Sequence, residues 1–214
     1  YLDKTMTIQG TVDKTAISLV LLIIAAYYTY SSGMESMIMI GSVGGLILAI
    51  VTIFKKQWAP FTVPFYAILE GLALGSLSYI YNVQYDGIVL QAISITVLVL
   101  FSLLFAYRSK IIKPTENFKL GLFAATGGIF LLYLISFVMS FFGSGISLLS
   151  SNNSSMLSIG LSFGIVIIAA LNLVIDFDFI EEGSEKGAPK YMEWYGAFGL
   201  LVTLIWLYLE LLRL

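Results

Sequence analysis

The sequence contains neither cysteine nor histidine, and only 11% of its residues are charged. Without cysteine the chain has no disulfide, no thiolate metal ligand and no thiol nucleophile. Without histidine it lacks the usual general base and the commonest ligand of transition metals. Proton chemistry therefore falls to carboxylates, lysines or tyrosines. A formal net charge of −2, with no basic domain and no charge-rich tail, excludes a nucleic-acid-binding protein.

Apolar residues dominate instead, at 59% of the chain, and the mean hydropathy is +0.95. A typical soluble domain has roughly a quarter of its residues charged. A soluble fold of 214 residues has too much surface to bury this much apolar side chain. We therefore predict an integral membrane protein, with the lipid bilayer as its surroundings.

Seven apolar runs approach the roughly 20 residues that a helix needs to cross a bilayer. They are long and continuous and do not alternate, which argues against membrane strands. The first run is not expected to be a cleavable signal peptide, because another apolar run follows it directly. We predict an all-α fold, a single seven-helix transmembrane domain over residues 1–214. The predicted spans are Ala16–Tyr30, Met37–Phe54, Phe61–Tyr81, Ile88–Tyr107, Leu120–Phe142, Leu157–Phe179 and Trp194–Leu212.

The cationic residues indicate an orientation. Ten of the eleven lie in alternate loops or at the ends of the runs beside them, and only Arg213 falls on the other side. Because loops rich in Lys and Arg stay in the cytoplasm, we predict a cytoplasmic N-terminus and an external C-terminus. The ten are Lys4, Lys14, Lys55, Lys56, Arg108, Lys110, Lys113, Lys119, Lys186 and Lys190.

Ionisable residues inside spans are costly and usually mark an ion path or a proton relay. Glu70 lies nine residues after Phe61, which places it roughly 13 Å into its span at 1.5 Å per residue. No Lys or Arg lies in a span core to neutralise it. Tyr66 and Thr62 share its helix face. We rank Glu70 as a candidate functional carboxylate, with a protonated structural glutamate as the alternative.

A second candidate site lies near the cytoplasmic end of the sixth run. Asn172 and Asp176 are four residues apart and share one face, whereas Asp178 points to another side of the helix. Asp178 also begins an acidic cytoplasmic rim with Glu181 and Glu182, for which a solvated helix face is the simpler interpretation. In the seventh run, Thr203 lies at mid-depth, and Glu210 near Arg213 is interpreted as interfacial.

These residue types suggest one kind of chemistry. Burial and like charge both disfavour ionisation of a carboxyl group, and converging carboxyl groups titrate as a coupled set. Ionised carboxylates are hard oxygen ligands that suit Ca²⁺ better than a soft metal. The hypothesis is a proton-gated cation path or proton relay, with Asp176 and Glu70 as candidate Ca²⁺ ligands and no cofactor.

An ordered set of motifs along nearly the whole chain resembles the Bax inhibitor-1 (transmembrane Bax inhibitor motif) family, and more closely its bacterial YccA-like branch. No single motif is a mechanistic signature, and the order of the set makes it specific. The motifs are Met6-Thr7, Gly10-Thr11, Lys14-Thr15, Trp58-Ala59-Pro60, Tyr66-Ala67 with Glu70-Gly71, Ala125-Thr126-Gly127-Gly128, Leu173 with Asp176-Phe177-Asp178-Phe179-Ile180-Glu181, Gly187-Ala188-Pro189-Lys190-Tyr191-Met192-Glu193-Trp194-Tyr195, and Leu211-Leu212-Arg213.

The resemblance implies a pH-sensitive calcium-leak protein, with six helices around a central seventh, in the bacterial inner membrane. It also implies a sensor made of two aspartates, on helices six and seven. Asp176 matches the first, but the place of the second falls at about Thr203, which cannot ionise. We therefore predict that Glu70 supplies the second carboxylate.

Two other functions are weighed against a gated leak. A non-conducting regulator would bind membrane proteases or other membrane proteins, and small-residue faces such as Gly41 to Gly45 and Gly71 to Gly75 suit such partners or internal packing. Internal packing is the simpler interpretation. An intramembrane hydrolase without Cys or His would need an aspartyl pair. Asp176 and Asp178 lack a partner aspartate on another helix, so we predict that the protein is not an enzyme.

Overall fold

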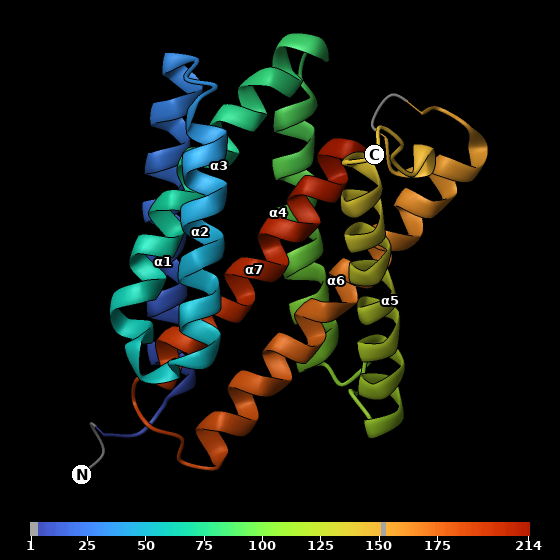
Figure 1. The fold of residues 1–214 in the computed structure, drawn as a ribbon. Coiled ribbons are helices and arrows are strands. Elements are labelled where there is room, and N and C mark those ends of the chain that lie inside the picture. The colour runs from blue at the N-terminus through green and yellow to red at the C-terminus, as the bar shows by residue number, and fades with distance from the viewer. Residues whose placement is uncertain (1–3, 151–152) are drawn as a thin grey trace. The chain divides into compact units, whose positions relative to one another are not determined.

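A computed structural model describes residues 4–150 and 153–214, and in this part of the chain all seven predicted spans are confirmed as helices (Figure 1). Each of the seven is long and apolar enough to cross a membrane. The fold is therefore that of an all-α integral membrane protein. The helices are α1 (Ile8–Ser32), α2 (Met37–Phe54), α3 (Ala59–Gln84), α4 (Ile88–Arg108), α5 (Glu116–Ser140), α6 (Met156–Glu185) and α7 (Met192–Arg213), with short 3₁₀ turns η2 (Lys56–Trp58) and η3 (Ser147–Leu149).

Local sequence signals place several helix ends. Thr115 caps α5 by accepting a hydrogen bond from the backbone N–H of Phe118 at 3.2 Å. Thr7 caps α1 in the same way through Gly10 N at 2.9 Å. Gly33 ends α1 with φ at 62°, a left-handed conformation that glycine adopts without strain.

Contacts divide the chain into two compact units. The first consists of Tyr1–Gln91 and Asp178–Val202, and the second of Ala92–Phe177 and Thr203–Leu214. The arrangement of six helices around a seventh and the single domain over 1–214 stay predictions.

Glycines hold the helices of the first unit together. A Cβ atom on Gly71 or Gly75 of α3 would overlap the α1 carbonyl oxygens of Leu22 or Ala26. The Thr29 hydroxyl of α1 donates to Leu72 O across the same contact at 2.9 Å. On the other side of α3, Gly41 of α2 lies against the carbonyl of Leu69. The prediction that these small residues serve internal helix packing is confirmed.

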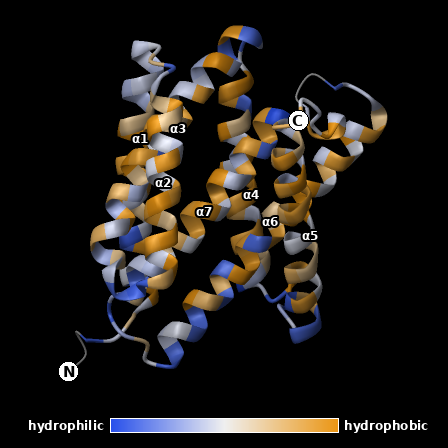
Figure 2. Ribbon diagram, viewed as in Figure 1, coloured by the Kyte–Doolittle hydropathy of each residue, from blue (hydrophilic) through white to orange (hydrophobic). Residues whose placement is uncertain are grey.

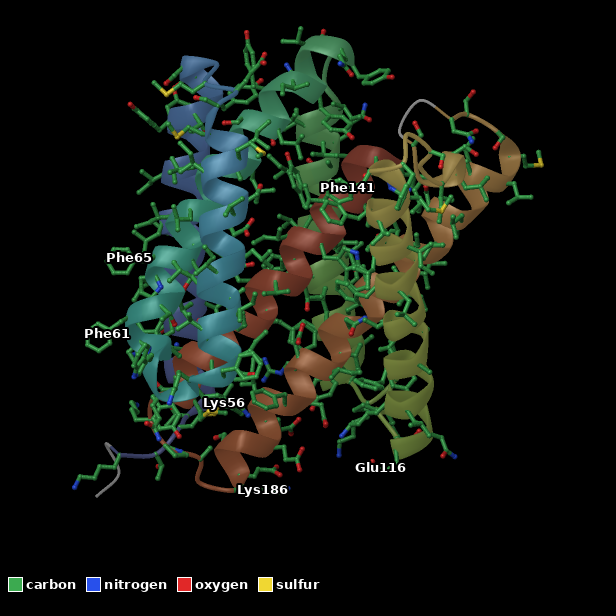
Figure 3. All side chains as sticks on the ribbon, viewed as in Figure 1. Lys56, Phe61, Phe65, Glu116, Phe141 and Lys186 are labelled. Atoms are coloured by element: carbon green, nitrogen blue, oxygen red, sulfur yellow. The ribbon has the colours of Figure 1, made fainter. Side chains whose placement is uncertain are left out.

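The outer faces of the helices are apolar, as a lipid environment requires. Figure 2 shows hydrophobic residues along most helices, with hydrophilic ones gathered mainly near the helix ends. Phe61 and Phe65 point away from α3 and are 75% and 62% exposed (Figure 3). So large an exposed apolar surface would be unstable in water and is covered by lipid tails in a bilayer.

In the second unit, an aromatic contact joins α5 to α7, and a polar contact joins the loop after α5 to α6. Phe130 of α5 packs on Trp206 of α7, with ring centroids 5.5 Å apart. The Ser158 hydroxyl of α6 donates to Leu148 O at 2.8 Å, which ties that loop to the start of α6. The second unit therefore has its own framework for the polar residues inside it.

Candidate functional site

Asp176 of α6 carries a buried carboxyl group in the second unit. The Thr203 side chain of α7 hydrogen-bonds its carboxyl group. Its other oxygen, Oδ2, is buried and has no hydrogen-bond partner among the described residues. Thr203 is itself 7% exposed. A buried, half-satisfied carboxyl group in a membrane span is expensive, which is the property expected of a functional group.

Asn172 continues this polar region one turn before Asp176. Its Nδ2 donates to the Thr126 hydroxyl of α5 at 3.0 Å and to Ile168 O at 2.8 Å. Asn172 and Asp176 share a face, as predicted. The four residues Thr126, Asn172, Asp176 and Thr203 form a column of polar side chains on three helices, which we call the polar column.

Thr126 was not among the predicted site residues. It stands in the quoted Ala125–Gly128 motif, but nothing in that motif indicates that its hydroxyl meets Asn172 of a different helix. The contact depends on how α5 and α6 face each other, and spacing along one helix carries no information about that.

Glu70 belongs to the first unit. Its carboxylate lies against Gly45 of α2, where a Cβ would overlap Oε1. It makes no hydrogen bond or ion pair with any residue in the described part of the chain. One turn earlier Tyr66 packs edge-on against Phe198 of α7, with ring centroids 5.1 Å apart. Because Glu70 and Asp176 lie in different units, their predicted pairing stays a prediction.

The helix face of Glu70 is polar toward the start of α3. The Thr52 hydroxyl of α2 lies 2.7 Å from the Thr62 hydroxyl, and Thr62 also donates to Trp58 O at 3.2 Å. Both threonines are buried. Glu70 therefore lies against a glycine of α2, whereas the polar pair of Thr52 and Thr62 lies two turns away.

The predicted acidic rim lies in the first unit at the end of α6. Glu181 and Glu182 are exposed, and Glu182 pairs with Lys186 one turn later. Asp178 is half-buried. Exposure of the two glutamates agrees with a solvated helix face, the simpler interpretation of these residues. Within residues 4–150 and 153–214, no three acidic residues come close enough to hold a metal ion.

Sequence reasoning missed Glu193, which is completely buried at the start of α7. Its Oε1 accepts hydrogen bonds from Thr7 N at 3.0 Å and Thr7 Oγ1 at 3.1 Å. Lys190 Nζ lies 2.8 Å from the same oxygen, and Lys14 Nζ lies 3.5 Å from Oε2. The two lysines compensate a charge that would otherwise be too costly to bury.

Backbone pairing strengthens this contact between distant segments. Met6 N donates to Ala188 O at 2.7 Å, and Lys190 N donates to Lys4 O at 3.1 Å. Two of the quoted motif segments, around Thr7 and around Glu193, thus form one structural joint. The sequence placed both segments in the motif set, but it did not indicate that they contact each other.

Glu210 pairs with Arg213 at the end of α7, as its predicted interfacial position suggested. Arg213 Nε and Nη2 lie 3.1 and 2.5 Å from Oε2. The Tyr133 hydroxyl of α5 donates to Oε1, a contact that the sequence did not indicate. Glu210 is 6% exposed and so is more deeply buried than an interfacial carboxylate in contact with water.

The chain matches a known protein family over its whole length. No curated protein and no solved structure matches the chain. A family model described as Bax inhibitor 1 like matches residues 1–214, the whole chain. Placement in the YccA-like branch stays a prediction. The protein belongs to the Bax inhibitor 1 like family.

Proposed function

We propose that the protein is a pH-sensitive cation leak channel, with Ca²⁺ as the favoured ion, gated by protonation of Asp176. The observation that carries this proposal is the buried Oδ2 of Asp176, which has no hydrogen-bond partner among the described residues. A carboxyl group in this position binds a proton or a cation far better than it tolerates an unpaired negative charge.

The polar column supplies the other oxygen ligands that such a path needs. The hydroxyls of Thr126 and Thr203 and the amide oxygen of Asn172 are hard, uncharged ligands of the kind that Ca²⁺ accepts. A single carboxylate among neutral ligands favours transient passage over tight binding, because Ca²⁺ affinity grows with the number of charged ligands.

We propose Glu70 as the second titrating carboxylate. Its support is its depth in α3 and the lack of any hydrogen bond or ion pair with a described residue. Thr203 stands where the family resemblance implies a second aspartate, so another carboxylate must fill that role if two are needed.

We also propose that the cation-rich loops face the cytoplasm of a bacterial cell. In the first unit, the N-terminal segment pairs with the loop before α7, and Lys56 lies 5.1 Å from the ring centroid of Tyr195 near the start of α7. The lysines of these three segments thus gather at one end of the unit, in support of a cytoplasmic N-terminus.

The alternative of a non-conducting regulator has less support. Its sequence argument was the small-residue faces, and the glycines of those faces in α2 and α3 are occupied by neighbouring helices of the same chain. The hydrolase alternative gains no support, because it needs a pair of aspartates. Among the described residues of the polar column, Asp176 is the only aspartate.

Calcium flux into proteoliposomes of the purified protein, measured from pH 5 to 8, tests the proposal. Asp176→Asn removes the titrating group and should abolish the pH dependence. Asp86→Asn, an exposed change of the same kind, should leave it intact. Folded wild-type protein with no flux above empty liposomes at any pH would overturn the channel.

Glu70 is tested separately in the same assay. Glu70→Gln should flatten the pH profile as Asp176→Asn does, whereas Glu116→Gln, on a side chain that is 95% exposed, should not. A normal profile for Glu70→Gln would remove Glu70 from the mechanism and leave Asp176 as a single sensor.

A further inference from the structure

The second unit contains an open surface cavity of about 340 Å³ that the proposed channel does not use. The cavity lies between the C-terminal halves of α5 and α7 and the η3 turn; Phe141, labelled in Figure 3, marks this end of α5. Its walls include apolar side chains as well as hydroxyl and charged groups. They are formed by Tyr133, Ser136, Phe137, Ser140, Leu149, Glu210 and Arg213.

Within residues 4–150 and 153–214, some hydrogen-bond donors of this cavity have no acceptor. Arg213 has five N–H groups, and three hydrogen bonds use them, two to Glu210 Oε2 and one from Nη1 to Leu149 O at 3.3 Å. The other two N–H groups make no hydrogen bond to a residue in the described part of the chain. The Ser136 hydroxyl accepts from Ile146 N at 3.4 Å, and its own hydrogen has no acceptor among the described residues.

The negative charge of Glu210, in contrast, is already satisfied. Three donors reach its carboxylate, namely Nε and Nη2 of Arg213 and the Tyr133 hydroxyl. Trp206 Nε1 lies 3.4 Å from the Tyr133 hydroxyl and holds it in place. The spare capacity of the cavity is therefore for a ligand that accepts hydrogen bonds, and an oxyanion fits two free guanidinium N–H groups best.

The depth of Arg213 in the bilayer indicates which kind of molecule supplies that oxyanion. Arg213 lies ten residues beyond Thr203, the middle of α7, so about 15 Å along the helix at 1.5 Å per residue. This distance is half of the roughly 30 Å hydrocarbon core, where lipid headgroups begin. The cavity is much larger than a phosphate ion, and Phe137 and Leu149 give it an apolar wall for the lipid's glycerol and upper chain.

We propose that this cavity binds the phosphodiester headgroup of a membrane phospholipid through Arg213 and Ser136. The Glu210 carboxylate holds the guanidinium in position, while the apolar wall takes the glycerol end of the chains. The bound lipid thereby joins α5 and α7 at the headgroup level. This site is independent of the proposed ion path.

Native mass spectrometry of the full chain, delipidated in a nonionic detergent, tests the site. The probe is dioleoylphosphatidylglycerol, and dioleoylglycerol is the matched lipid without phosphate. We expect one saturable phosphatidylglycerol adduct and no comparable binding of dioleoylglycerol. Equal binding of the two lipids would overturn the phosphodiester proposal, and displacement by inorganic phosphate at a similar concentration would show a site for a free ion instead.

Two variants test the residues. The double variant Glu210→Gln and Arg213→Gln keeps the cavity neutral. It should weaken the affinity for phosphatidylglycerol about tenfold, as loss of a charge-assisted hydrogen bond predicts. Ser136→Leu fills the cavity while leaving the ion pair, and should have a similar effect. Arg108→Gln, an exposed arginine at the end of α4, is the control. Wild-type affinity in both variants, or an equal loss in the control, would overturn the proposal.

Discussion

The Thr203 side chain of α7 hydrogen-bonds the carboxyl group of Asp176 on α6, at the place where the family resemblance implies a second aspartate. A hydroxyl there stabilises its partner without carrying a charge, so the two helices meet without the repulsion of two carboxylates. The second unit therefore has one ionisable group in its polar column instead of two.

Replacing Thr203 by valine should measure what this contact contributes. Valine keeps the shape but cannot donate, and hydrogen bonds between membrane helices contribute roughly 0.6 to 1.7 kcal/mol. We expect the free energy of unfolding to fall by about 1 kcal/mol in a reversible detergent-unfolding titration. Thr203→Ser should restore most of the loss, and a valine variant as stable as wild type would contradict the contact.

The Asn172–Thr126 bond predicts a coupling between α6 and α5. Asn172→Leu and Thr126→Val should each destabilise the protein, and the double variant should cost less than the sum. The difference, measured as a double-mutant cycle in the same titration, should be about 0.6 kcal/mol. Strictly additive effects would mean that the two side chains do not interact.

The close contact of α3 with α1 at Gly75 predicts that a larger side chain at this position destabilises the protein. Gly75→Ala would push a methyl group into Ala26 O and the Thr29 hydroxyl, and overpacking of this kind costs about 1 to 3 kcal/mol. Gly127→Ala on α5 is the matched control, since nothing lies within 4 Å of its added Cβ. Alanine favours helix more than glycine by about 1 kcal/mol, so this variant should be neutral or more stable. Equal thermal stability of the two variants would contradict the packing.

Loss of the buried charge at Glu193 should release the N-terminal segment. Glu193→Gln removes the ion pairs with Lys14 and Lys190, and we expect the free energy of unfolding to fall by about 2 kcal/mol, because both lysines stay partly in water. Hydrogen exchange of the amides of Met6 and Lys190 should become faster, since their backbone pairing depends on this joint. Glu185→Gln, in an exposed position on α6, should change neither quantity.

Most of the fold could be predicted because each helix is determined by its own residues. Runs such as Met37–Phe54 must cross the bilayer as helices, since lipid offers no partner for backbone polar groups. Thr115 marks a helix start by its own side chain. The roles of Gly71 and Gly75 followed from their size, although the sequence could not say that α1 is the helix they meet.

The sequence by itself determined seven membrane helices and the carboxylates they carry, because hydropathy and helix periodicity act within one segment. Only the tertiary structure decided that Thr203 meets Asp176, that Thr7 and Lys14 enclose Glu193, and that Tyr133 reaches Glu210. Each of these contacts joins residues on different helices. The cost of burying an unpaired polar group selects such partners, and it acts only where helices pack against each other.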